Sequence, residues 1–158
     1  MKKELCTGCP YEGESTKVVE GIRMDKEILL IMQSPGSNEN KTGIPLSGIK
    51  GSTATKILES LLPNGRTLED YAVTELVKCY PRDKQLDKIA IAICYRYLEK
   101  EISKGNYKRI VCFCVDAIPI VKNIKKRNSQ DFEVIACAYP KNTITDKEKE
   151  TITKALTF

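Results

Sequence analysis

The chain has 158 residues, a length that suits one domain over residues 1–158 with a substantial hydrophobic core. Its 41% hydrophobic and 30% charged residues are ordinary for a globular protein, and no apolar stretch approaches the length of a membrane span. The net charge of +5 permits a polyanionic partner without demanding one, and the absence of histidine excludes histidine metal ligands and Ser-His catalytic sites.

The first half of the chain predicts two buried strands with a loop and a helix between them. Residues 26–32 and 71–78 are short, continuous apolar runs, as expected for buried strands. Residues 33–51 form a long polar loop with four glycines and two prolines. Residues 52–62 have helical spacing, with Ser52 as a candidate N-cap.

The second half predicts helices alternating with two more strands. Residues 86–104 form the longest helical pattern, followed by a strand over 108–114 and a short helix over 116–123. A fourth strand is expected over 132–138 and a last helix over 145–157. Strands alternating with helices indicate an α/β fold with a mostly parallel sheet.

Four of the seven cysteines form two pairs, Cys6 and Cys9 as C-x2-C and Cys79 and Cys94 as C-x14-C. Two such pairs supply the four thiolates that either a [4Fe–4S] cluster or a structural zinc accepts, and spacing alone does not separate these two. Buried packing thiols are the alternative, although the first pair lies in a polar segment that burial does not explain.

The remaining cysteines lie in apolar runs and are expected to be packing residues: Cys112, Cys114 and Cys137. The first two are expected to face opposite sides of the sheet. An odd number of cysteines argues against a secreted disulfide scaffold and favours the reducing cytoplasm.

The loop over residues 33–51 directly follows a buried strand, where α/β sheets bind ligands. Residues 31–48, IMQSPGSNENKTGIPLSG, resemble the first motif of the family 4 uracil-DNA glycosylases, V-G-E-A-P-G-x-x-E-D-x-x-G-x-P-F-V-G. Residues 73–81, VTELVKCYP, are similar to the family's strand V-T-N-V-V-K-C-R-P, which carries the third cluster cysteine. The helix bearing Cys94 matches the position of the fourth.

This resemblance implies a three-layer α/β/α sandwich with a mostly parallel four-stranded central sheet. It implies a [4Fe–4S] cluster on Cys6, Cys9, Cys79 and Cys94, with zinc as the alternative. It also implies an enzyme that extrudes a base from DNA and cleaves its N-glycosidic bond. We therefore expect DNA as the partner, no membrane association, a monomeric chain and a cytoplasmic location.

The chain departs from the family at positions that would touch the base, the water or the leaving group. Gln33 and Ser34 replace Glu and Ala, Leu46 replaces Phe, Glu75 replaces Asn, and Tyr139 replaces His. A carboxylate that offers acceptors only would oppose uracil O4 but would pair with the N4 amino group of cytosine. We therefore predict a cytosine-type base.

Other substitutions set the remaining expectations for the pocket. Gly36 and Leu46 leave room beside the base, so that a C5-substituted cytosine, such as one in phage DNA, is the expected target. Glu39 is the expected carboxylate for positioning water, with Ser34 orienting that water and Gln33 keeping the shape of the family's Glu without its charge. Tyr139 is the expected donor to the departing base.

Contacts to the DNA backbone are expected from Ser47, Gly48, Ser52, Arg82 and Lys141, and a basic turn that includes residues 125–127 is a further candidate. Alternatives remain open for individual residues: Glu75 in a structural ion pair and Tyr139 in the core. For the whole chain, the alternatives are an ordinary uracil-DNA glycosylase in base-excision repair and a catalytically inactive DNA-binding homologue.

Overall fold

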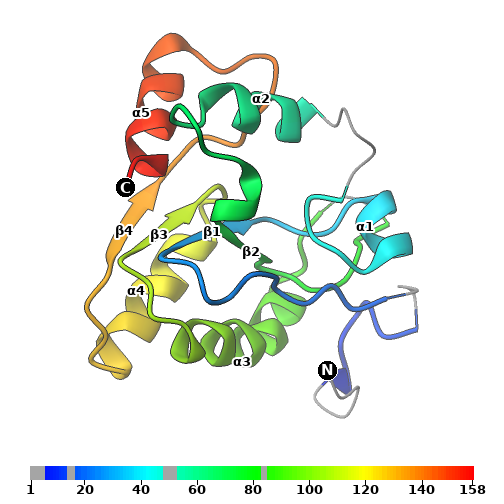
Figure 1. The fold of residues 1–158 in the computed structure, drawn as a ribbon. Coiled ribbons are helices and arrows are strands. Elements are labelled where there is room, and N and C mark those ends of the chain that lie inside the picture. The colour runs from blue at the N-terminus through cyan, green and yellow to red at the C-terminus, as the bar shows by residue number, and fades with distance from the viewer. Residues whose placement is uncertain (1–5, 14–16, 48–52, 83–84) are drawn as a thin grey trace.

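A four-stranded sheet lies at the centre of the molecule. The computed structural model describes residues 6–13, 17–47, 53–82 and 85–158 (Figure 1). The strands, β1 (Ile28–Met32), β2 (Ala72–Glu75), β3 (Arg109–Cys112) and β4 (Glu133–Ala136), lie in the order β2-β1-β3-β4. Every neighbouring pair is parallel, so the expected mostly parallel sheet is wholly parallel.

Helices cover both faces of the sheet. They are α1 (Ser37–Thr42), α2 (Thr53–Leu61), α3 (Lys88–Lys104), α4 (Ala117–Arg127) and α5 (Asp146–Leu156), with a 3-10 turn η2 (Leu68–Asp70). Helices α3 and α4 lie against one face, and α2 and α5 lie against the other (Figure 1). This arrangement confirms the three-layer α/β/α sandwich.

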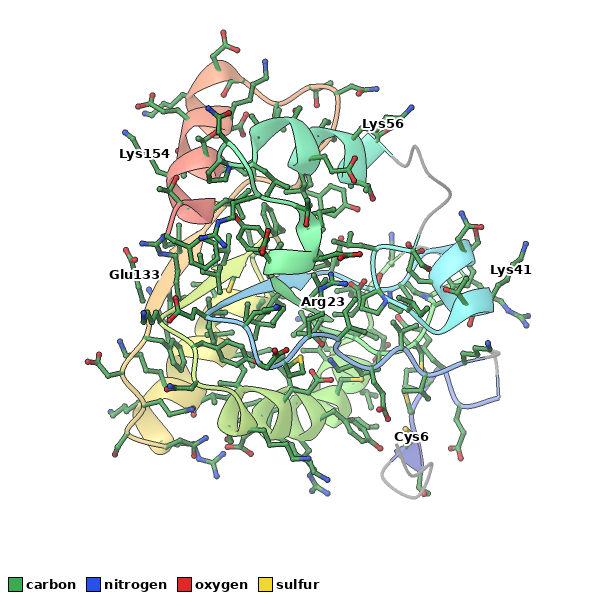
Figure 2. The ribbon with its side chains drawn as sticks, in the orientation of Figure 1. Cys6, Arg23, Lys41, Lys56, Glu133 and Lys154 are labelled. Atoms are coloured by element: carbon green, nitrogen blue, oxygen red, sulfur yellow. The ribbon has the colours of Figure 1, made fainter. Side chains whose placement is uncertain are left out.

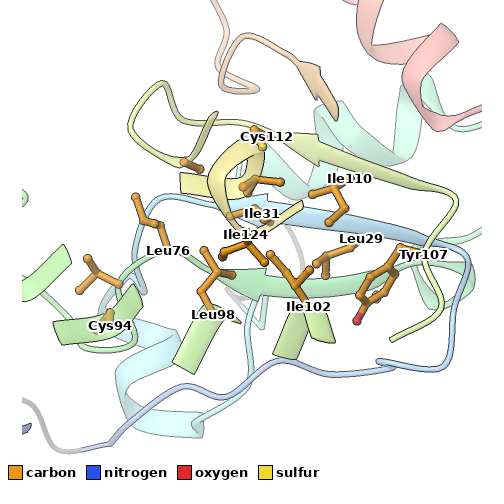
Figure 3. Close-up of a cluster of buried hydrophobic side chains, with 14 of the residues drawn as sticks. Leu29, Ile31, Leu76, Cys94, Leu98, Ile102, Tyr107, Ile110, Cys112 and Ile124 are labelled. Carbon is orange, nitrogen blue, oxygen red and sulfur yellow. The ribbon is translucent and has the colours of Figure 1, made fainter. Parts of the chain in front are cut away.

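The two-residue period of the strands divides the core into two clusters. In β1, Leu29 and Ile31 pack with α3 and α4, as Figure 3 shows, whereas Leu30 and Met32 pack toward α2 and α5. Because β1 lies inside the sheet and is covered on both faces, all five of its residues are buried. Burial of each Leu or Ile side chain stabilises the folded state by about 1.5–3 kcal/mol relative to an exposed side chain.

The loop predicted over residues 33–51 contains α1, which the sequence did not indicate because none of its residues is buried. The expected basic turn is instead the last turn of α4, since Pro119 lies in the first turn of that helix, where proline is tolerated. The strand over 71–78 is shorter than expected and ends at Glu75.

The expected orientation of two cysteines is wrong. Cys112 and Cys114 both pack against the cluster beneath α3 and α4, because residues two apart along a strand face the same side. Both are packing residues, as is Cys137, which packs against the other cluster. In the described residues no helix is long and apolar enough to cross a membrane.

Candidate functional site

A pocket of about 370 Å³ opens at the edge of the sheet where the strands end. Outside the carboxyl ends of parallel strands, loops diverge and leave room for a ligand. The pocket is lined by residues that follow β1, by α1, by the start of α2, by the end of β2 and by the segment after β4. Seven residues singled out from the sequence meet there: Ser34, Gly36, Glu39, Leu46, Glu75, Tyr139 and Lys141.

Glu75 is the deepest polar group of this pocket. It ends β2 opposite Met32 in the parallel ladder and is only 2% exposed. Its Oε2 atom has no hydrogen-bond partner among the described residues. Burial, together with the nearby Glu39 and Glu101 and against the opposing charge of Lys78, raises the pKa of Glu75 to about 8.

The structural ion pair considered for Glu75 is not formed among the described residues, because the nearest cation is already engaged. The ammonium of Lys78 donates hydrogen bonds to Thr74 Oγ1 and to Glu101 Oε2 instead. Lys78 is 1% exposed, so this network is buried beside the pocket. Glu75 is thus available to a ligand rather than committed to a structural partner.

Glu39 folds its side chain across Gly36. A Cβ atom placed on Gly36 would lie 2.7 Å from Glu39 Oε2, and the backbone φ of −82° at Gly36 is open to any residue. Glycine is therefore favoured at this position because a larger side chain would collide with Glu39, and not because of its backbone conformation. The room expected beside Gly36 is filled by the Glu39 carboxylate, which borders the pocket.

Tyr139 is 43% exposed, so it does not belong to the core. Partial burial raises the pKa of its hydroxyl, and the charges of Glu75 and Glu39 raise it further. These three side chains therefore lie close enough to influence one another electrostatically. Lys141, exposed beside Tyr139, lines the same pocket and provides a positive charge at its rim.

Other predicted residues lie elsewhere. Gln33 is exposed and absent from the pocket lining, and its carbonyl accepts a hydrogen bond from the Val77 amide at 3.1 Å. Ser47 hydrogen-bonds Thr42 through its hydroxyl. Arg82 is exposed on the surface. Gly48 and Ser52 lie outside the described residues.

The basic residues 125–127 lie at the opposite edge of the sheet, because α4 runs back from the end of β3 to the start of β4. Lys125 donates to the Phe132 carbonyl, and Arg127 pairs with Glu99 at 3.4 Å. Sequence reasoning missed two lysines nearer the pocket, Lys41 on α1 and Lys56 on α2, which point outward in Figure 2.

The four paired cysteines lie in one region beside the start of α3. None of the four forms a disulfide among the described residues, and they come from the N-terminal segment, the segment after β2 and α3 itself. The Tyr97 hydroxyl lies 3.6 Å from Cys6 Sγ. Burial raises the pKa of this hydroxyl, and the charges of Cys6, Cys94 and Cys79 raise it further. Burial also raises the pKa of Cys9, and the charge of Cys6 adds to that shift. The folded chain thus brings both cysteine pairs together.

Hydrogen bonds hold this region in place. The buried Tyr11 hydroxyl donates to the Gln85 carbonyl at 2.7 Å and accepts from the Asp87 amide, tying the C-x2-C segment to the N-terminus of α3. The Lys78 amide donates to Cys94 Sγ at 3.5 Å. Donors to sulfur of this kind support thiolate ligands and tune a bound cluster.

The four cysteines are ligands of the kind that both an iron–sulfur cluster and a structural zinc accept. Among the described residues, no three Cys, Asp or Glu side chains are close enough to one another to hold one metal ion. A tetrahedral zinc requires four thiolates converging on one centre, whereas a cubane of four irons accepts one thiolate at each iron and holds them farther apart.

Comparison with known proteins identifies the family. The sequence profile of the Uracil DNA glycosylase superfamily matches residues 20–157. The chain belongs to this superfamily. A type-4 uracil-DNA glycosylase of Thermotoga maritima is 31% identical over 123 residues, which cover 77% of this chain and 62% of the relative.

Two archaeal relatives are also type-4 uracil-DNA glycosylases. That of Sulfurisphaera tokodaii is 33% identical over 108 residues, 65% of this chain and 47% of the relative. That of Saccharolobus solfataricus is 38% identical over 79 residues, 48% of this chain and 35% of the relative. The chain therefore matches between about a third and three fifths of the length of these superfamily members.

Proposed function

We propose that this member of the superfamily is a DNA glycosylase that extrudes a base into the pocket and hydrolyses its N-glycosidic bond. The observation that carries the proposal is the pocket itself. It gathers Ser34, Glu39, Glu75, Tyr139 and Lys141 from three separate segments at the carboxyl edge of the sheet. Superfamily membership and the names of the curated relatives support the same reaction.

The reaction asks for two kinds of stabilisation. Water attacks the C1′ carbon of the sugar as the N-glycosidic electron pair leaves with the base, so positive charge develops on the sugar and negative charge on the base. Glu39 is the proposed group that positions the water and takes its proton, and Ser34 orients that water. Tyr139 donates a hydrogen bond to the departing base.

Gln33 is the weakest of the proposed catalytic residues. Its exposed side chain and its backbone bond to Val77 favour a role in shaping the loop after β1. Because Gln33 lacks the negative charge of the family's Glu, the carboxylates that line the pocket are Glu39 and Glu75, and Glu39 is the one proposed to position the water.

Phosphate contacts are proposed for Lys141 at the pocket rim and for Ser47 and Arg82, with the exposed Lys41 and Lys56 adding positive charge on the neighbouring helices. Such contacts position the protein on DNA without specifying sequence. Neutral variants of the charged residues are expected to weaken DNA binding and to make it less dependent on salt concentration, so that their difference from wild type shrinks as the salt concentration rises.

The proposed target is a cytosine-type base with a substituent at C5, as in modified phage DNA. Glu75 occupies the position where an amide would read uracil, and its unpartnered oxygen can accept from the N4 amino group of cytosine. Leu46 is smaller than the family's Phe. A hydroxyl on the C5 substituent would meet the Glu39 carboxylate beside Gly36.

A [4Fe–4S] cluster on Cys6, Cys9, Cys79 and Cys94 is the proposed cofactor, with zinc as the alternative. Four cysteine thiols gathered beside α3 support it. The cluster would order the C-x2-C segment and the segment after β2. Cysteines that form no disulfide among the described residues also favour work in the reducing cytoplasm. Iron and sulfide analysis with visible absorbance distinguishes the two metals.

Abasic-site formation on a panel of DNAs tests the function. The cluster-loaded protein is incubated with DNA holding uracil, thymine, cytosine, hydroxymethylcytosine or glucosylated hydroxymethylcytosine, beside Glu39→Ala as the inactive control. Release of a cytosine-type base, lost in Glu39→Ala, is expected. Release of uracil alone would mean an ordinary uracil-DNA glycosylase, and DNA binding without release would mean an inactive homologue.

A further inference from the structure

Glu75 is a buried acid with one carboxylate oxygen that has no hydrogen-bond partner among the described residues. It is 2% exposed and lines the pocket. A buried carboxylate with no counter-ion is costly, whereas a buried neutral carboxyl keeps one donor and one acceptor for a ligand. The geometry of the empty pocket therefore favours the protonated form.

Groups from several elements around the pocket act on Glu75, and Lys141 at the pocket rim is not among those that shift its pKa. The groups that act on it are Lys78 after β2, Glu101 on α3, Glu39 on α1, Cys114 after β3 and Tyr139 after β4. The single cation among them is paired with Glu101, and the others are acids or groups that are neutral at pH 7. The effects of burial and of the two carboxylates outweigh the effect of the Lys78 ammonium. The pKa of Glu75 is therefore raised to about 8.

Building on the proposed glycosylase function, we propose that Glu75 reads the extruded base as a neutral carboxylic acid. One proton then sets the preference of the pocket between uracil-type and cytosine-type bases. With the proton present, the hydroxyl donates to uracil O4 while the carbonyl accepts from N3–H. With the proton on the other oxygen, the same group donates to cytosine N3 and accepts from the N4 amino group.

Loss of the proton affects the two bases differently. The N3–H of uracil lies between the O2 and O4 carbonyl oxygens, so a carboxylate that approaches it always meets an acceptor. The N4 amino group of cytosine lies at the outer edge of the ring beside C5, where a carboxylate can accept from it without facing N3. Ionised Glu75 is therefore selective for cytosine-type bases, whereas neutral Glu75 admits both.

Infrared spectroscopy of the free protein tests the protonation state independently of catalysis. The carbonyl stretch of a protonated carboxyl group is expected at pH 7, disappearing as the pH rises through about 8. Glu75→Gln removes this band, and Glu59→Gln, an exposed control on α2, leaves it in place. A wild-type spectrum without the band at pH 7 overturns the inference whether or not the protein releases any base.

Base release across pH tests the consequence. The neutral fraction of an acid with a pKa of about 8 falls about tenfold between pH 7 and pH 9, so uracil release relative to hydroxymethylcytosine release should fall by about tenfold. In Glu75→Gln, which keeps a donor and an acceptor at every pH, this ratio should stay flat. A flat wild-type ratio, or an equal slope in the variant, overturns the inference.

The experiments distinguish failure of the proposed glycosylase function from failure of the inference about Glu75. If no DNA in the panel loses a base at any pH, the glycosylase proposal fails. The ratio is then taken from binding affinities for the same uracil and hydroxymethylcytosine duplexes at pH 7 and pH 9. A fall in relative uracil affinity in the wild type that is absent in Glu75→Gln supports proton-gated reading, and a constant ratio overturns it.

Discussion

Two buried ionisable residues, one at the end of β2 and one three positions later, have opposite surroundings. Lys78, 1% exposed, is satisfied by Thr74 and Glu101. Glu75, 2% exposed, has an oxygen with no partner among the described residues and borders the pocket. A buried ionisable side chain that is paired stabilises the fold, whereas one with an unpartnered polar atom is available to bind a ligand.

Breaking the ion pair between Lys78 and Glu101 should have the largest effect on stability. Glu101→Ala leaves the Lys78 ammonium buried without its counter-ion, which should lower the free energy of unfolding by about 3–5 kcal/mol. Glu99→Ala on the same helix breaks the surface pair with Arg127 and a hydrogen bond from the Tyr95 hydroxyl, and should cost about 1 kcal/mol or less. Denaturant titration measures both, and equal losses would contradict the difference between the two pairs.

Replacing Glu75 with a residue that does not titrate should change how stability depends on pH. The folded pKa of Glu75, about 8, lies above its ordinary value of 4.5, so the folded state holds the proton more tightly than the unfolded chain. This contribution is complete below pH 4.5 and is lost as the pH rises to about 8.

Glu75→Gln should abolish that loss. The free energy of unfolding of the variant relative to wild type should rise by about 3 kcal/mol between pH 5 and pH 8. Denaturant titrations at several pH values measure the difference, with the exposed Glu59→Gln as the control expected to follow wild type. Parallel curves for Glu75→Gln and wild type would show that Glu75 is ionised in the folded protein.

The proposed donor to the departing base has a smaller, purely catalytic effect. Tyr139→Phe removes one hydroxyl from a side chain that is 43% exposed, so stability should change by about 0.5 kcal/mol or less. Base release should fall about a hundredfold, as for other donors to developing negative charge. Single-turnover kinetics measure the rate, and an unchanged rate would remove Tyr139 from the mechanism.

The smallest expected effect concerns the position of Glu39. Gly36→Ala places a methyl group where Glu39 Oε2 lies, and the flexible carboxylate must shift. Base release should fall about tenfold while stability stays within about 0.5 kcal/mol of wild type. A large loss of stability would instead mean that Gly36 serves the fold of the loop.

The sequence predicted the parallel sheet because apolar runs and helical spacing are local signals. It also singled out seven residues that meet in one pocket: five from the motif over residues 31–48 and the strand over 73–81, and Tyr139 and Lys141 from the segment after the fourth strand. It did not predict α1, whose six residues bury no side chain.

The burial of Lys78 could not be predicted for a different reason. A lysine at the end of a strand ordinarily faces solvent, and its burial depends on Glu101, which lies 23 residues away on α3. The surroundings of Glu75 could not be predicted for the same reason. Its Oε2 atom has no partner among the described residues, and the nearby Lys78 is paired with Glu101 on α3. Such properties belong to contacts between distant segments rather than to local pattern.

The most direct measurement is a competition for two bases in one reaction. Duplexes with uracil and with hydroxymethylcytosine are mixed at pH 8, and the ratio of released bases is compared between the wild type and Glu75→Asn. We expect the wild type to favour hydroxymethylcytosine and Glu75→Asn, which restores the family's amide, to favour uracil. An identical ratio in both proteins would contradict the assignment of Glu75 as the group that reads the base.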